Sequence, residues 1–166
     1  MNPGTGPQEV GTTEQKLMLV TCLIGTNVVT YSPPLKNTPQ AMTVTTTQTH
    51  TTCLGGPAGL TSATGFSSTF RPQNSCLDLL FIIPTMSSVT WNTGETSTFS
   101  HMQVNTRVEG LAVVLVQEGT VVSGKFAGAT VVRTFTLAQT DLDACSSDEG
   151  LAGITGPATM TLTKLL

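Results

Sequence analysis

The chain has 166 residues, of which only 10% are charged, and its formal net charge at pH 7 is −3. Its seven Lys and Arg residues form no basic cluster, which argues against a nucleic-acid partner. No stretch approaches the ~18 apolar residues of a membrane-spanning helix, so no membrane partner is expected either. The length predicts one domain, and the abundance of Thr, Val, Gly and Ser favours an all-β fold.

The first fifteen residues are polar and rich in Gly, Pro and Thr, which predicts a flexible tail over residues 1–15 before a single domain over 16–166. Such a tail is either disordered or a lid over the mouth of a barrel. The opening MNPGTGPQEV lacks the basic and apolar regions of a secretory signal. We therefore expect either a cytoplasmic protein or a secreted one whose signal peptide has been removed.

The first third of the domain predicts three strands, at residues 16–23, 27–31 and 41–52. Pro33 and Pro34 are expected to end strand pairing, because proline lacks the amide donor of a strand ladder. The third strand alternates between a threonine face, in contact with water, and a second face. That second face comprises Met42, Val44, Thr46, Gln48 and His50.

The rest of the chain predicts short strands separated by turn residues. The apolar run from Leu77 to Pro84 is too short for a membrane span and predicts a buried strand. Loops are expected at residues 54–65 and 141–153. The remaining strands are predicted at residues 66–70, 77–83, 87–91, 97–108, 111–116, 129–137 and 159–165.

Roughly nine or ten strands joined by short turns predict an antiparallel meander. Closure into an eight-to-ten-stranded β-barrel removes the exposed strand edges of such a sheet. A two-sheet β-sandwich is the alternative.

Four cysteines lie far apart, with no C-x-x-C pair, and the two histidines are isolated, so no structural metal site is expected. Two disulfides are expected instead, with three connectivities open. We favour Cys22–Cys53 with Cys76–Cys145, because this pairing joins each early strand to a later neighbour. Four buried free thiols are the alternative.

The segment from Gly110 to Leu137 holds two β-branched runs around a centre with Gly119, Gly124 and Gly128. Glycines between strands are typical of the corners of small antiparallel barrels. The segment VSGKFAGAT, residues 122–130, resembles the glycine-rich corner of allene-oxide-cyclase-like and dirigent-like barrels, an architecture also used by spirotetronate-type cyclases.

A broader resemblance rests on Thr21-Cys22, Tyr31-Ser32-Pro33, Trp91-Asn92-Thr93-Gly94, the corner, and Gly156-Pro157-Ala158-Thr159. Together these segments resemble a family of small, mostly secreted actinobacterial β-barrel proteins without an assigned activity. The resemblance to the cyclase barrels implies a calycin-like fold and an interior that holds a small molecule.

No nucleophile elbow, P-loop, dinucleotide fingerprint or H-E-x-x-H motif is present, so the catalytic residues stay unassigned and no cofactor is expected. An apolar pocket with a few polar groups is typical of small-molecule sites. For any single residue, a place in the core is the alternative to ligand contact. The candidate lining residues are Tyr31, Met42, Gln48, Phe81, Trp91, Phe99, His101, Met102, Gln103, Phe126, Arg133, Phe135 and Met160, with His50 and Gln117 as further polar candidates.

Two functions follow as hypotheses. The first is a cofactor-independent cyclase that binds a linear polyketide, an apolar substrate, and promotes a [4+2]-type (Diels-Alderase) ring closure by orientation. The second is a secreted, disulfide-stapled binding or structural module without catalysis. A carrier of an apolar ligand shares the cavity of the first, and self-association to a homodimer is left open.

Overall fold

The computed structural model describes residues 16–80 and 85–165. The expected N-terminal tail and the candidate residue Phe81 lie outside these residues. Within the described part of the chain, no helix is long and apolar enough to cross a membrane.

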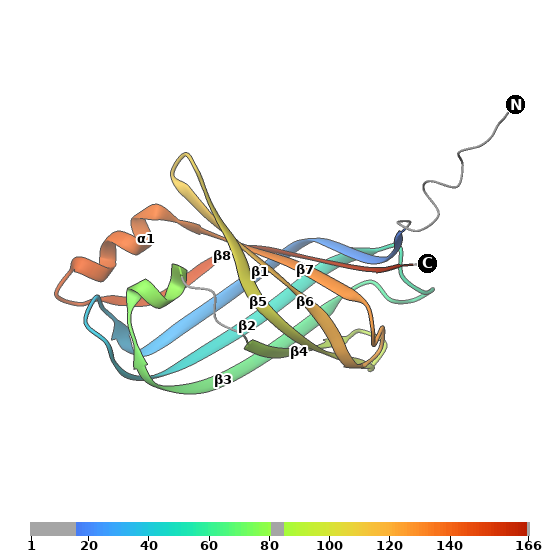
Figure 1. Ribbon diagram of the computed structural model, residues 1–166, viewed down its shortest axis with the longest axis horizontal. Helices are drawn as coiled ribbons and strands as arrows, with labels where there is room; N and C mark the ends of the chain where they lie inside the picture. The colour runs from blue at the N-terminus through green and yellow to red at the C-terminus, as the bar shows by residue number, and fades with distance from the viewer. Residues whose placement is uncertain (1–15, 81–84, 166) are drawn as a thin grey trace, which may run out of the picture.

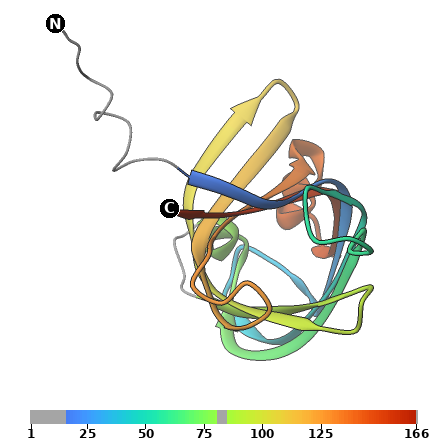
Figure 2. The same cartoon turned by 90° about the vertical axis from the view of Figure 1, so that its right-hand side faces the viewer.

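Eight antiparallel strands form a closed barrel in which each strand pairs with the next and the last pairs with the first. The barrel predicted from the sequence is confirmed, and the sandwich alternative is excluded. Figures 1 and 2 show the strands around a common interior. The strands are β1 (Lys16–Leu35), β2 (Gln40–Leu54), β3 (Ala63–Asn74), β4 (Thr85–Trp91), β5 (Thr96–Glu109), β6 (Ala112–Gly124), β7 (Thr130–Ala138) and β8 (Leu151–Leu165).

The two strands predicted at residues 16–23 and 27–31 are one continuous strand, β1. Its pairing with β8 shifts register between Cys22 and Thr26, where the sequence predicted a break. Such an irregularity bends a strand without ending it. Beyond Thr30 the pairing with β8 is interrupted again, until Leu35 pairs with Leu151, so Pro33 and Pro34 interrupt the ladder without ending the strand.

Two further predictions are wrong. The strand expected at residues 77–83 is a 3-10 helix, η2 (Cys76–Leu80), in its described part. The Asp78 carboxylate accepts a hydrogen bond of 2.7 Å from the Ser75 amide, which favours a turn over a strand. The loop expected at 141–153 contains the end of helix α1 (Gln139–Asp143), a 3-10 helix η3 (Ala144–Ser146) and the first residues of β8.

Both favoured disulfides are present, Cys22–Cys53 and Cys76–Cys145. The first joins directly paired residues of β1 and β2. The second joins η2 to η3, and Cys145 is buried rather than exposed. Four free thiols are therefore excluded.

The glycine-rich corner is the β6–β7 turn, and it needs the left-handed backbone region at three positions. Gly124 and Gly128 have φ values of +83° and +92°, and Phe126 has a φ of 65°. The Phe126 ring packs against Trp91 at 5.5 Å in an edge-to-face arrangement. This contact anchors the corner to the Trp91 side of the core.

The barrel interior holds two hydrophobic clusters. The Trp91 cluster includes Val20, Phe99 and Val131, and the Tyr31 cluster includes Met42 and Leu137. Along each of β1, β2 and β7, residues of one cluster come first, polar inward residues follow, and residues of the other cluster come last. The polar residues therefore form a layer between the two clusters, and the functional site lies in this layer.

Candidate functional site

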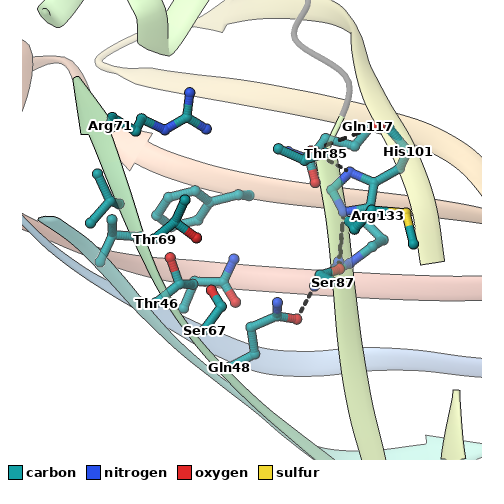
Figure 3. A pocket seen from close by; sticks show the side chains of 15 residues that line it. Thr46, Gln48, Ser67, Thr69, Arg71, Thr85, Ser87, His101, Gln117 and Arg133 are labelled. Atoms are coloured by element: carbon teal, nitrogen blue, oxygen red, sulfur yellow. Dashed lines mark hydrogen bonds between the residues drawn. The ribbon is translucent and has the colours of Figure 1, made fainter. Parts of the chain in front are cut away.

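The interior contains a cavity of about 180 Å³. Each of β1 to β7 contributes at least one side chain to its wall, and most of these side chains are polar (Figure 3). The lining residues are Asn27, Val29, Val44, Thr46, Gln48, Ser67, Thr69, Arg71, Thr85, Met86, Ser87, His101, Gln117, Arg133 and Phe135.

The cavity reaches the surface between β3 and β4. These two strands pair at only two positions, Ala63 with Trp91 and Thr64 with Thr90. Beyond them the strands share no ladder, and the exposed side chains of Thr69 and Met86 line the cavity on either side. The barrel wall beside the cavity is therefore weakly paired at this place.

Arg133 is the charged group at the centre of the site. It occupies an inward position of β7 between Val131 and Phe135, and it is only 5% exposed. Its guanidinium donates hydrogen bonds to Ser87 Oγ at 2.7 Å and to Gln48 Oε1. The guanidinium carbon also lies 5.4 Å from the centre of the Phe99 ring. Three strands thus hold this side chain in place.

Among residues 16–80 and 85–165, no carboxylate pairs with Arg133. The ion pairs within residues 16–80 and 85–165 are Arg107–Glu109 and Lys125–Glu95, and neither faces the cavity. No Asp or Glu is among the residues that line it. Burial lowers the pKa of Arg133 to about 10, so the guanidinium stays protonated at neutral pH.

His101 is a neutral partner in the same network. Its Nδ1 lies 3.2 Å from Thr85 Oγ1, and its Nε2 lies 3.0 Å from Ser87 Oγ. Burial and the charge of Arg133 lower the pKa of His101 to about 4. At neutral pH the His101 ring is therefore uncharged. It takes part in hydrogen bonds but adds no positive charge to the site.

Four of the predicted candidates line the cavity together, namely Gln48, His101, Arg133 and Phe135. The further polar candidate Gln117 does so as well, whereas His50 is buried outside its wall.

The other candidates lie elsewhere. Trp91, Phe99, Phe126 and Met160 pack in or against the Trp91 cluster, and Tyr31 and Met42 belong to the Tyr31 cluster. Gln103 is buried and donates to Thr106 Oγ1 at 3.0 Å.

The prediction that Met102 lines the interior is wrong. Its side chain is 40% exposed, while His101 and Gln103 on either side of it are buried. Because side chains alternate along a strand, His101 and Gln103 face inward and Met102 faces outward.

The sequence did not single out several polar residues of the wall, including the short Asn27, Ser67 and Ser87 and the long Arg71. Serine and threonine in a strand ordinarily indicate a face in water. The signal that identifies Ser67 and Ser87 is parity, because each occupies the same face of its strand as a known inward residue, Ala63 or Val89.

The fold and the site define a closed eight-stranded barrel with a positively charged polar cavity. Compared with known proteins, the chain matches no family model, no curated protein and no solved structure. The argument for function therefore depends on the site alone. Within the described residues, no group of three or more His, Cys, Asp or Glu is arranged to hold a metal ion.

Proposed function

We propose that the barrel binds a small organic acid in its interior, with Arg133 as the anchor for the acidic group. The observation that carries this proposal is a buried guanidinium that has no carboxylate neighbour among the described residues. A charge removed from water is costly unless an opposite charge and hydrogen bonds compensate for it. A ligand carboxylate compensates for that cost directly.

The geometry of the guanidinium suits this role. A guanidinium has five N–H donors, and its contacts with Ser87, Gln48 and His101 Nε2, the last at 3.4 Å, use three of them. A carboxylate binds such a group through two parallel hydrogen bonds. Ser87 and Gln48 hold the guanidinium in place from two other strands, which reduces the entropy lost on binding.

The volume and polarity of the cavity restrict the ligand. Common ligand pockets have volumes of about 300–1,000 Å³, and this cavity has about 180 Å³. The lining favours a small polar acid over the apolar ligand expected from the sequence. The cavity accommodates only one end of a long linear ligand.

A second candidate is the cyclase inferred from the sequence resemblance. Arg133, Ser87 and His101 form one hydrogen-bonded network, and donors of this kind polarise a carbonyl during ring closure. Conversion of a linear carbonyl compound into a cyclic isomer of the same mass distinguishes this activity from binding alone.

The two disulfides support a place outside the cytosol. Disulfides persist in oxidising compartments and are rare where glutathione keeps thiols reduced. We therefore favour a secreted binding protein, with the acid-binding cavity as its functional part.

The test is isothermal titration of the protein with sodium propionate. Arg133→Gln keeps a polar side chain of similar length and removes the charge. Arg107→Gln is the matched control, because Arg107 lies on the surface in an ion pair with Glu109. We expect Arg133→Gln to weaken binding at least tenfold and Arg107→Gln to leave it unchanged.

Equal binding by the wild type and Arg133→Gln overturns the proposal, and so does the absence of propionate binding to the wild type. Circular dichroism verifies that the variant is folded. Ser87→Ala, which removes a partner of Arg133 and keeps the charge, is the second variant, with an expected loss of a few-fold.

A further inference from the structure

Arg71 is a second arginine in the wall of the cavity. It lies on β3, is partly buried, and lines the same cavity as Arg133. In the described part of the chain Arg71 forms no ion pair, and no Asp or Glu from that part lines this cavity. An acid with a single carboxylate bound at Arg133 therefore leaves the second positive charge of the cavity without an anion.

Strand register places the two arginines at different heights in the barrel. Arg133 donates to Gln48, whose partner on β3 is Gly65. Arg71 pairs instead with Met42, six positions away on either strand (65 to 71 and 48 to 42). At a rise of roughly 3.3 Å per residue, six positions cover about 20 Å of strand. Both side chains line one cavity, which shortens the gap between their charges, and Figure 3 shows Arg71 apart from the group formed by Arg133 and its partners.

The wall between the two arginines is partly apolar. Val29 and Val44 line the cavity from β1 and β2, at positions between the Gln48 and Met42 levels. Phe135 follows Arg133 on the inner face of β7, which runs parallel to β1 because both pair antiparallel with β8. The Phe135 ring therefore lies on the side of Arg133 that faces the Arg71 level. Short hydroxyl side chains of β2 and β3 complete this part of the wall.

We propose that the ligand is a short linear dicarboxylic acid, with one carboxylate at Arg133, the other at Arg71, and its methylene groups against the apolar wall between them. This assignment rests on the proposed function and adds the class of ligand. An arginine binds a carboxylate through two parallel hydrogen bonds, so each end of the ligand has its own anchor. Two fixed anchors select one chain length, whereas a general attraction of anions to a positive cavity does not.

Asp78 is an acidic residue near Arg71 that could compete with such a ligand. Both residues line a smaller cavity of about 100 Å³, but no ion pair joins them. The Asp78 carboxylate accepts hydrogen bonds from the Ser75 amide at 2.7 Å and from the Ser75 hydroxyl at 3.4 Å. Asp78 thus serves the turn that begins η2, and the Arg71 guanidinium is left to a ligand.

The test compares dicarboxylates with monocarboxylates of equal length by isothermal titration, in the pairs succinate and butyrate, adipate and hexanoate, and suberate and octanoate. We expect the preference for the dicarboxylate to be largest at one length, where it reaches about tenfold. Arg71→Gln keeps a polar side chain and removes the charge, so the two acids of that pair then bind equally. Arg107→Gln, at a surface ion pair with Glu109, is the matched control and keeps the preference.

The outcomes separate this assignment from the proposed function. Equal binding of each dicarboxylate and its monocarboxylate to the wild type overturns the assignment and leaves the acid site standing. The same holds for a preference that is equal at all three lengths, or one that survives in Arg71→Gln. If none of the six acids binds, the proposed function fails and this inference fails with it.

A second variant guards against a change in the fold. Arg71→Lys keeps the positive charge and loses the paired donors, so we expect it to retain a preference of a few-fold. Circular dichroism verifies that both Arg71 variants are folded. The comparison of chain lengths uses the wild-type protein, so it decides the assignment even if a variant does not fold.

Discussion

Arg133 is held by neutral partners alone, in the part of the barrel where a hydrophobic side chain would pack more easily. Its neighbours along β7 on the inner face are Val131 and Phe135, each part of or packed against a hydrophobic cluster. An arginine kept there for stability would have a carboxylate partner. Function is the better reason for its presence.

Replacing Arg133 by Met tests whether this arginine lowers the stability of the protein. Met fills a similar volume without a charge, so we expect the free energy of unfolding to rise by about 1–2 kcal/mol, since the desolvation cost of the guanidinium disappears. Denaturant titration measures the change, with Arg107→Met as the control, which is expected within about 0.5 kcal/mol of the wild type. A large loss of stability would show that Arg133 is structural.

The two buried histidines predict a loss of stability in mild acid. Burial, with the nearby charge of Arg133, lowers the pKa of His50 and of His101 from 6.5 to about 4. The unfolded state therefore binds more protons than the native state below pH 6.5. Stability is full above that pH and falls by a few kcal/mol as the pH drops towards 4.

Denaturant titrations between pH 7 and pH 4.5 measure this slope. His101→Gln removes one titrating group, so the pH dependence in this window should fall by about half. A free energy of unfolding that is constant between pH 6.5 and 5 would contradict the assignment of neutral, buried histidines.

At the level of elements, close contact between β5 and β6 sets the position of His101. Gly119 on β6 pairs with His101 on β5. A Cβ at position 119 would lie 1.9 Å from Ser100 O and 2.6 Å from His101 Cα, both backbone atoms. Only a residue without a side chain allows the two strands to approach here.

Gly119→Ala is therefore expected to separate β5 from β6 and to lower the free energy of unfolding by about 2–3 kcal/mol. Gly56→Ala is the control, because its nearest neighbour is the flexible end of Leu60, at 3.3 Å. Thermal denaturation compares the two variants. Equal melting temperatures would contradict the packing described for this strand pair.

The two disulfides close loops of different lengths, so they are expected to stabilise the protein to different extents. Cys76–Cys145 closes a loop with a sequence separation of 69, whereas Cys22–Cys53 closes one of 31. Loop-closure entropy predicts a loss of about 4 kcal/mol for Cys76→Ala with Cys145→Ala, and slightly less for the other pair. Denaturant titration of both double variants tests this order, and a clearly larger loss for Cys22–Cys53 would contradict it.

The sequence was sufficient to predict most strands and to favour a barrel over a sandwich, because alternation and turn residues are local signals. The threonine face of β2 was visible in the chain itself. The 3-10 helix η2 was not predicted, because the Ser75–Asp78 hydrogen bond outweighs the apolar composition of this segment. The continuity of β1 depends on its neighbours β2 and β8, which pattern alone does not show.

The site was predictable only in part. Gln48, His101 and Arg133 stood out as polar residues on predicted strands among the large lining candidates, and the structure brings them together. Trp91 was expected beside them, but register places it in a packed cluster, in which only Phe99 reaches Arg133. Sequence patterns indicate which side of a strand faces inward. They do not indicate the height in the barrel at which each inward residue lies.

At the scale of the whole molecule, the chain has few charged residues, and the presence of two of them in the interior is unusual. The chain has seven Lys and Arg residues, and two arginines, Arg71 and Arg133, line one cavity without an acidic residue in its wall. Such a cavity attracts anions because its walls exclude water and leave the positive charge weakly screened. This property of the cavity supports the proposal that the barrel binds a small acid.

The most direct test of this account is the NMR signal of the Arg133 Nε–H in the ¹⁵N-labelled protein, recorded during titration with propionate. The signal is assigned by its absence in Arg133→Gln. We predict that it shifts and saturates with increasing acid, while the signal of the surface residue Arg107 does not. An Arg133 signal that stays unchanged up to high concentrations of propionate would contradict the central claim.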